Sequence, residues 1–272
     1  MWNADLYDRF AMERRQPSID LAEKAGIFWN SRQEEAGGKA VPVRILDVGC
    51  GSGLSTLSLR EHFPEAEITG VDLSGEMLLN AQKLLPEVSF LQRDCSEPLS
   101  DLGQYDIVFS NAFLQWLEDQ EAFLRNIREN LAEGGILALQ VPNFYPMPAG
   151  RAIRAVAREF PACADIGRDE TRVRGAMNLP MEWYYDALSR HYGTVKLWQT
   201  NYIHQMESTD AIVSFVSGTA LIPFLARLSE EEKREFMEKL HRKMMEAYPA
   251  AENGKVLFPF ERLFFLACDA ER

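Results

Sequence analysis

The sequence predicts an α/β protein built around a doubly wound, mostly parallel sheet. Five short β-rich runs alternate with helix-patterned segments between residues 43 and 143, as is typical of strands joined by crossover helices. Some runs, such as DIVFS at 106–110, are almost continuously apolar, which is expected of strands covered on both faces. The first run leads into a glycine-rich turn, ILDVGCGSGLS at 45–55.

The predicted elements of the first half follow in order. Residues 1–29 carry a helical pattern, and the polar stretch 30–42 contains glycines and closes with a proline, so we expect an N-terminal helical segment and linker over 1–41. The α/β core should occupy 42–206. Its patterns predict strands at 43–49, 66–74, 88–94, 105–111 and 136–143, and helices at 75–85 and 120–135.

The second half alternates less regularly. The pattern predicts helices at 151–160 and 181–193, a strand at 194–206, and an arginine-rich solvated loop at 168–175. Ser229 and Glu232 have the spacing of a capping box, ahead of a helix with Phe236, Leu240 and Met244 on one face. Because 207–258 has no place in a minimal sheet, we expect it to form a helical lid, with 259–272 as the last strand of the core.

Composition narrows the classes of partner. The 272 residues are 46% hydrophobic and carry a formal net charge of -12, so the surface would repel a phosphate backbone and a small molecule is a better partner than nucleic acid. The four cysteines are too widely spaced for a metal motif and fit a reducing cytoplasm. No signal peptide or run of 18 apolar residues is present, so we expect no membrane segment. The sequence gives no indication of oligomeric state.

The glycine turn predicts a nucleoside site. Gly49, Gly51 and Gly53 would let backbone N–H groups approach a ligand closely, although a purely structural tight turn is the alternative. A dinucleotide fingerprint would need a third glycine at Leu54. Asp72 ends the second strand, where an acid can accept from ribose hydroxyls, and Asp94, if it is not a turn residue, could accept from adenine. The missing glycine and the acidic surroundings favour S-adenosylmethionine over a dinucleotide.

Five motifs in order, ILDVGCGSG, GVDLS, RDCSEP, YDIVFSNAFLQWL and LAEGGILAL, resemble those of class I S-adenosylmethionine-dependent methyltransferases. The resemblance implies a Rossmann-like, seven-stranded sheet whose last strand is antiparallel. It implies a methionine tail at the glycine turn, ribose at Asp72, adenine near Asp94, and the sulfonium beside Asn111. The expected cofactor-binding residues are Gly49, Cys50, Gly51, Asp72, Leu73, Met77, Asp94, Cys95, Asn111 and Ala112.

Outside these motifs, LYDRFAMERRQP, TNYIHQM, FVSGTALIPFL and AYPAAENGKVLFPFERLFFLA are similar to the trans-aconitate 2-methyltransferases nearly end to end. The resemblance implies that a carboxylate of a small acid, trans-aconitate or a related acid, is converted to a methyl ester. Two departures bear on the substrate. Gln16 and Ile222 stand where the family typically carries arginine, which removes bidentate carboxylate partners; Arg15 is a candidate replacement for the first.

The chemistry of the residues can be weighed separately. A carboxylate is already ionised at neutral pH and needs alignment rather than a general base, which suits a chain with four histidines of which only His204 is placed to meet a substrate. We therefore expect no catalytic acid or base. Transfer to a carrier-bound acid or a natural-product hydroxyl, or a non-catalytic cofactor-binding module, are the alternatives. The expected substrate-binding residues, each of which could instead be an ordinary core or surface side chain, are Arg14, Trp116, Tyr202, His204, Gln205 and Arg262.

Overall fold

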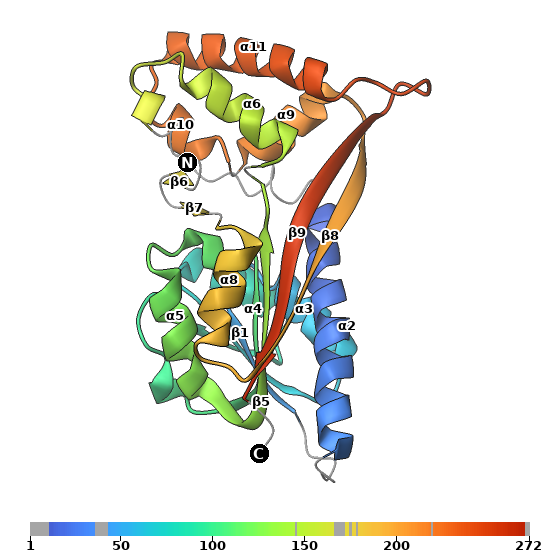
Figure 1. Ribbon diagram of the computed structural model, residues 1–272, viewed down its shortest axis with the longest axis vertical. Coiled ribbons are helices and arrows are strands. Elements are labelled where there is room, and N and C mark those ends of the chain that lie inside the picture. The colour runs from blue at the N-terminus through green and yellow to red at the C-terminus, as the bar shows by residue number, and fades with distance from the viewer. Residues whose placement is uncertain are drawn as a thin grey trace. The chain divides into compact units, whose positions relative to one another are not determined.

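The computed structural model describes residues 11–35, 43–144, 146–165, 172–173, 176–177, 179–218 and 220–269. Within these residues a seven-stranded sheet has the order β3-β2-β1-β4-β5-β9-β8 (Figure 1). The pairs β1–β2, β1–β4, β2–β3 and β4–β5 are parallel, which confirms a mostly parallel, doubly wound core. The strands are β1 (Arg44–Val48), β2 (Glu67–Asp72), β3 (Ser89–Gln92), β4 (Tyr105–Asn111), β5 (Leu131–Pro142), β8 (Thr194–Met206) and β9 (Val256–Cys268).

The helices connect these strands and cover the sheet. Ser74 begins one of them by accepting a hydrogen bond from Met77 N–H, and Ser229 and Glu232 form the expected capping box of another. Figure 1 shows α5 and α8 on one side of the sheet and α2 on the other. The helices are α2 (Ala11–Glu35), α3 (Leu54–His62), α4 (Gly75–Leu84), α5 (Gln120–Asn126), α6 (Pro148–Ala157), α8 (Met181–Ser189), α9 (Thr209–Ser217), α10 (Ile222–Leu225) and α11 (Glu230–Ala247), with short 3-10 turns η1 (Ser100–Leu102), η2 (Leu114–Trp116) and η3 (Ile127–Asn130).

The chain divides into two compact units. The core unit comprises Arg14–Val141, Pro180–Gln199 and Leu263–Arg272, and the helical unit comprises Met1–Glu13, Pro142–Leu179 and Thr200–Arg262. Both β8 and β9 therefore contribute residues to each unit. In the core unit the central strands β1 and β4 are almost wholly buried, with Ile45, Leu46 and Phe109 fully excluded from solvent.

The helical unit has its own hydrophobic core. Phe236, Leu240 and Met244 of α11 are fully buried, as their spacing predicted. Phe160, just beyond α6, stacks obliquely on Phe236 with ring centroids 5.4 Å apart, and Lys239 of α11 pairs with Glu159 at 2.8 Å. The helical region is thus wider than the lid expected over 207–258, because α6 buries its apolar face against α11 (Figure 1).

Several expected boundaries are wrong. Helix α2 runs to Glu35 rather than giving way to a linker at residue 30, since no proline or glycine interrupts 30–35. The helix expected at 120–135 ends by Asn130, because Leu131 already pairs with Tyr105 as the start of β5. Helix α6 begins at Pro148, where a proline is favoured in the first turn. The last strand starts at Val256 instead of 259.

Candidate functional site

The glycine turn after β1 has the backbone conformation that its composition predicted. Gly49 and Gly51 have φ values of 72° and 54°, in the left-handed region. A Cβ on Gly49 would lie 2.3 Å from the Phe113 ring, so no larger residue fits there. The N–H groups of Gly49 and Cys50 both donate to Val71 O, at 2.8 and 3.0 Å. The turn is therefore held against the end of β2.

Asp72 ties the turn to the second strand more directly. Its Oδ2 accepts from Gly51 N–H at 3.0 Å and its Oδ1 accepts from Ser74 N–H at 2.9 Å. The side chain is half-buried, while Leu73 beside it is 62% exposed. The structure thus brings Asp72 to the glycine turn, and the neighbouring Leu73 side chain is exposed to solvent.

The residues expected near adenine have mixed environments. Asp94 is exposed, and its Oδ1 accepts from Ser96 Oγ and N–H at 2.6 and 2.9 Å; these bonds hold the pKa of Asp94 below its usual value. This is the geometry of a turn residue. Cys95 is buried, and burial raises its pKa to about 12. Met77 lies over the turn, with its Cε 3.2 Å from the place of a Cβ on Gly51.

At the end of β4, Asn111 and Ala112 adjoin β5. Asn111 pairs in register with Gln140. Ala112 is the one residue other than glycine with a positive φ, 54°, within the part of the chain that the structure describes. Its N–H donates to Gln140 O at 2.9 Å, and its carbonyl accepts from Gln115 Nε2 at 2.6 Å. A left-handed alanine is strained, and here both of its peptide groups are pinned. Trp116, in η2, is 43% exposed.

Asp47 was not singled out from the sequence. It is fully buried in β1, where its Oδ2 accepts from the hydroxyls of Ser55 and Thr56, each at 2.7 Å. Burial raises its pKa from 3.8 to about 6, although the two hydroxyl donors favour the charged form. Asp47 thus holds the first turn of α3 against β1 through these two hydrogen bonds. The signal in the sequence was an acid within the apolar run RILDV.

Four of the expected substrate-binding residues fall in the helical unit, namely Tyr202, His204, Gln205 and Arg262. Tyr202 and His204 are half-buried on one face of β8, and Gln205 is exposed on the other, as strand alternation predicted. The His204 ring lies 6.3 Å from that of Phe260, and the Arg262 guanidinium carbon lies 4.3 Å from the same ring centroid. Arg262 is only 6% exposed. Phe260 therefore links a histidine and a buried arginine on one apolar face.

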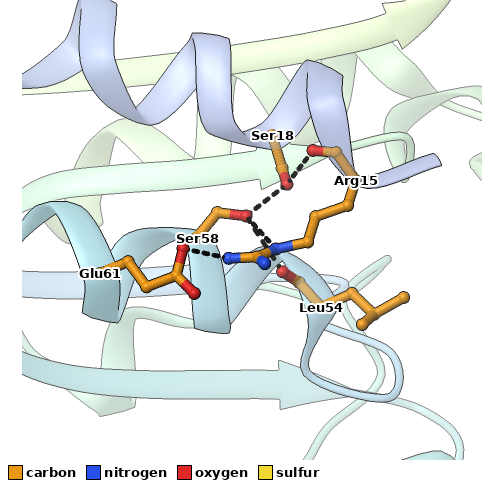
Figure 2. A network of polar contacts seen from close by, with 5 residues as sticks. All are labelled: Arg15, Ser18, Leu54, Ser58 and Glu61. Carbon is orange, nitrogen blue, oxygen red and sulfur yellow. Dashed lines mark hydrogen bonds and ion pairs between the residues drawn. The ribbon is translucent and has the colours of Figure 1, made fainter. Parts of the chain in front are cut away.

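The N-terminal arginines have different outcomes. The side chain of Arg14 lies outside the described residues. Figure 2 shows Arg15 extending from α2 to α3, where its Nε donates to Ser58 Oγ at 3.2 Å and its guanidinium pairs with Glu61. Ser18 Oγ completes the network, 2.8 Å from Ser58 Oγ. Arg15 is thus engaged between two helices of the core unit and does not replace an arginine at Gln16, whose amide donates to Asp20.

The remaining expectations concern loops, metals and membranes. Of the arginine-rich loop, the structure describes Arg172–Val173, which pairs with Ala176–Met177 as a two-stranded sheet; Arg168 and Arg174 lie outside the described residues. Ile222 opens the short helix α10. The described part of the chain contains no group of three or more histidine, cysteine or acidic side chains able to hold a metal. None of its helices is long and apolar enough to cross a membrane.

Comparison with known proteins places this geometry in a family. A family model described as a methyltransferase domain matches residues 46–139. The trans-aconitate 2-methyltransferase of Methylobacterium nodulans is 37% identical over 270 residues, which cover 98% of this chain and 97% of that one. The chain belongs to the trans-aconitate 2-methyltransferase family. Its relatives of the same name in Azoarcus sp. and Variovorax paradoxus are 35% and 36% identical, each over 98% of this chain.

Solved structures agree on the fold of this family member. The YcgJ protein from Bacillus subtilis has a TM-score of 0.57 at 13% identity and covers 92% of this chain and 99% of its own. The plantazolicin methyltransferase BpumL has a TM-score of 0.53 at 16% identity and covers 98% of this chain and 90% of its own. At these identities the likeness concerns the fold alone, a Rossmann-like class I methyltransferase fold.

Proposed function

We propose that the protein transfers the methyl group of S-adenosylmethionine to a carboxylate of trans-aconitate, giving a monomethyl ester. The observation that carries this proposal is the similarity to curated trans-aconitate 2-methyltransferases over 98% of the chain, at 35 to 37% identity. That similarity extends through both units and is not confined to the residues 46–139 that the methyltransferase domain model matches. It therefore bears on the acceptor as well as on the methyl donor.

The residues of the core unit fit S-adenosylmethionine. The left-handed Gly49 and Gly51 present backbone without a Cβ, the Asp72 carboxylate stands at the end of β2, and Asn111 Oδ1 is buried with no hydrogen-bond partner among the described residues. An amino-acid tail, a ribose and a positively charged sulfonium would satisfy these three features in turn. The residues proposed to hold the cofactor are Gly49, Cys50, Gly51, Asp72, Leu73, Met77, Asp94, Cys95, Asn111 and Ala112.

When bound, the cofactor supplies a methyl group on a sulfonium. The protein itself needs to align the acceptor and exclude water from it. A carboxylate is ionised at neutral pH, so no side chain has to remove a proton. The apolar surroundings of His204 and Arg262, formed by Phe215, Phe258 and Phe260, would strip water from an anion while the buried guanidinium offsets its charge.

We propose that the acceptor is held by Arg14, Trp116, Tyr202, His204, Gln205 and Arg262. Gln16 and Ile222 offer no positive charge at the two positions where the resemblance implies arginine, so Arg262 carries more of the work of binding a polyanion. A protein with a net charge of -12 has no broad attraction for such a substrate, which makes a local buried cation more important. The working compartment we propose is the cytoplasm, in accord with four buried cysteines that form no disulfide.

A methyl-transfer panel tests this function. The purified protein would be incubated with labelled S-adenosylmethionine and trans-aconitate, cis-aconitate, citrate, a carrier-bound acid and a hydroxylated aromatic. The highest kcat/KM is expected for trans-aconitate. Preference for the carrier-bound acid or for the hydroxyl would assign a different acceptor to the same fold, and binding of S-adenosylhomocysteine without any transfer would indicate a non-catalytic module.

A further inference from the structure

Unsatisfied amides gather where β4 and β5 end. Asn111 Oδ1, Gln115 Oε1 and both side-chain polar atoms of Gln140 are buried and find no hydrogen-bond partner among the residues that the structure describes. Gln140 is 1% exposed and Gln115 is 5% exposed. Native proteins leave few buried polar atoms unpaired, because each one destabilises the fold. Three of these atoms are oxygens, which accept and so favour a positively charged or hydrogen-donating partner, whereas Gln140 Nε2 is a donor and requires an acceptor.

The three amides are built around a single strained residue. Asn111 and Gln140 are register partners on parallel strands, so their side chains leave the sheet on the same face. Between them and Gln115 lies Ala112, with its φ of 54°, its N–H bonded to Gln140 O and its carbonyl bonded to Gln115 Nε2. Strain of this kind persists where the surrounding contacts enforce it, and it is concentrated at functional sites.

We propose that Gln140 donates a hydrogen bond from its side-chain Nε2 to the reacting carboxylate of the acceptor, an inference that rests on the proposed function. Asn111 is one of the residues assigned to the methyl donor, so a group held by Gln140 lies beside that site. Asn111 and Ala112 are half-buried, and a ligand would reach the Gln140 amide from their side. Rotation of its terminal amide lets Gln140 present an N–H donor in either of two positions.

Neutral amides suit the oxygen that attacks. As that oxygen bonds to the methyl carbon, the bond between sulfur and the methyl group would break and its electron pair would stay on the sulfur. The carboxylate thereby loses its negative charge, and the sulfonium becomes a neutral thioether. A guanidinium on the reacting carboxylate would stabilise the charged ground state more than the transition state and would slow transfer. An amide orients the oxygen through a weaker hydrogen bond from a neutral donor, and cationic side chains remain for carboxylates that do not react.

The variant Gln140→Leu tests the inference. The matched control is Gln104→Leu, at an exposed glutamine that directly precedes β4. Three quantities are measured for each: kcat and KM for trans-aconitate, the Kd of S-adenosylhomocysteine by calorimetry, and Tm. For Gln140→Leu we expect kcat/KM to fall about 10- to 100-fold, as for the loss of a hydrogen bond to a charged group. The Kd should stay within about twofold, and Tm should be unchanged or higher because an unpaired buried amide has been removed. The control should alter none of the three.

Other outcomes overturn the inference. Unchanged kcat/KM, or a loss no larger than the loss of folded protein together with a lower Tm, would make Gln140 structural. Weaker binding of S-adenosylhomocysteine would assign the amide to the methyl donor instead. If the wild type binds S-adenosylhomocysteine but does not methylate trans-aconitate, the proposed function fails on its own, and calorimetric binding of trans-aconitate to wild type and variant then decides the role of Gln140. Should the leucine variant not fold, Gln140→Met, unbranched and similar in length, replaces it.

Discussion

The buried Asp47 predicts a specific dependence of stability on pH. Its pKa rises from 3.8 to about 6 on folding, so between these values the folded state binds a proton that the unfolded state has released. Stability from this group is therefore complete below the unfolded pKa and is lost as pH rises through the folded pKa. A tenfold change in an acid constant is worth about 1.4 kcal/mol, so the shift corresponds to a loss of about 3 kcal/mol, of which roughly 2.5 falls between pH 4 and pH 8.

The perturbation is Asp47→Asn, which cannot ionise but keeps an oxygen to accept from the Ser55 and Thr56 hydroxyls. Its amide nitrogen would take the place of Oδ1, which has no hydrogen-bond partner among the described residues, at a cost of about 1–3 kcal/mol at every pH. The variant should therefore be less stable than wild type at pH 4 and close to it, or more stable, at pH 8.

Urea unfolding of both proteins at several pH values measures this difference. The wild-type free energy of unfolding, minus that of the variant, should fall by about 2.5 kcal/mol from pH 4 to pH 8. Asp94→Asn is the matched control, because hydrogen bonds from Ser96 lower the pKa of the exposed Asp94. For this variant, the wild-type free energy of unfolding minus that of the variant should fall as the pH falls, which is the opposite direction to Asp47→Asn. Parallel pH curves for wild type and Asp47→Asn would refute the assignment of Asp47 as a buried acid that is protonated at low pH.

Three further substitutions are expected to act as follows. Asp72→Ala should weaken S-adenosylhomocysteine binding about 100-fold or more by calorimetry, since a carboxylate that accepts two hydrogen bonds is lost; unchanged affinity would mislocate the ribose. Gly49→Ala should lower both Tm and cofactor affinity, because a Cβ would lie 2.3 Å from Phe113 in a backbone with positive φ; a normal Tm would contradict this. Arg15→Ala should lower stability by about 1 kcal/mol or less, as its partner Glu61 is largely exposed, and leave kcat/KM for trans-aconitate unchanged, whereas a selective rise in KM would return Arg15 to the substrate.

Much of the fold follows from local pattern. Residues close together in sequence determine three kinds of feature: the apolar strands β1, β2 and β4, the glycine turn, and the Ser229 capping box. The structure confirms all three. The predicted first and last residues of helices and strands were less accurate. The helical pattern at 120–135 continues past Asn130, but pairing of Leu131 with the distant Tyr105 converts the following residues to strand, and such pairing outweighs local propensity.

The site divides in the same way. The proximity of Gly49, Gly51 and Asp72 could be predicted because it depends on backbone conformation and on strand ends; their role in binding a cofactor stays a prediction. Asp47 could not, because an acid within an apolar strand reveals its burial and its raised pKa only when α3 packs over it. The amides of Gln115 and Gln140 look like ordinary polar residues in the sequence, and only the folded chain shows that they lack partners. The sequence left Arg15 as a candidate for binding substrate, because it does not reveal that Glu61 of α3 lies beside Arg15 in the folded protein.

Identification of the methylated product tests the central claim most directly. The protein would be incubated with S-adenosylmethionine carrying a deuterated methyl group and with trans-aconitate, and the product would be analysed by mass spectrometry before and after mild alkali. A single deuterated methyl on trans-aconitate that alkali removes is the expected result, since esters hydrolyse under these conditions. A methyl group that survives alkali, or the absence of transfer from a donor that binds, would contradict carboxyl methylation by this protein.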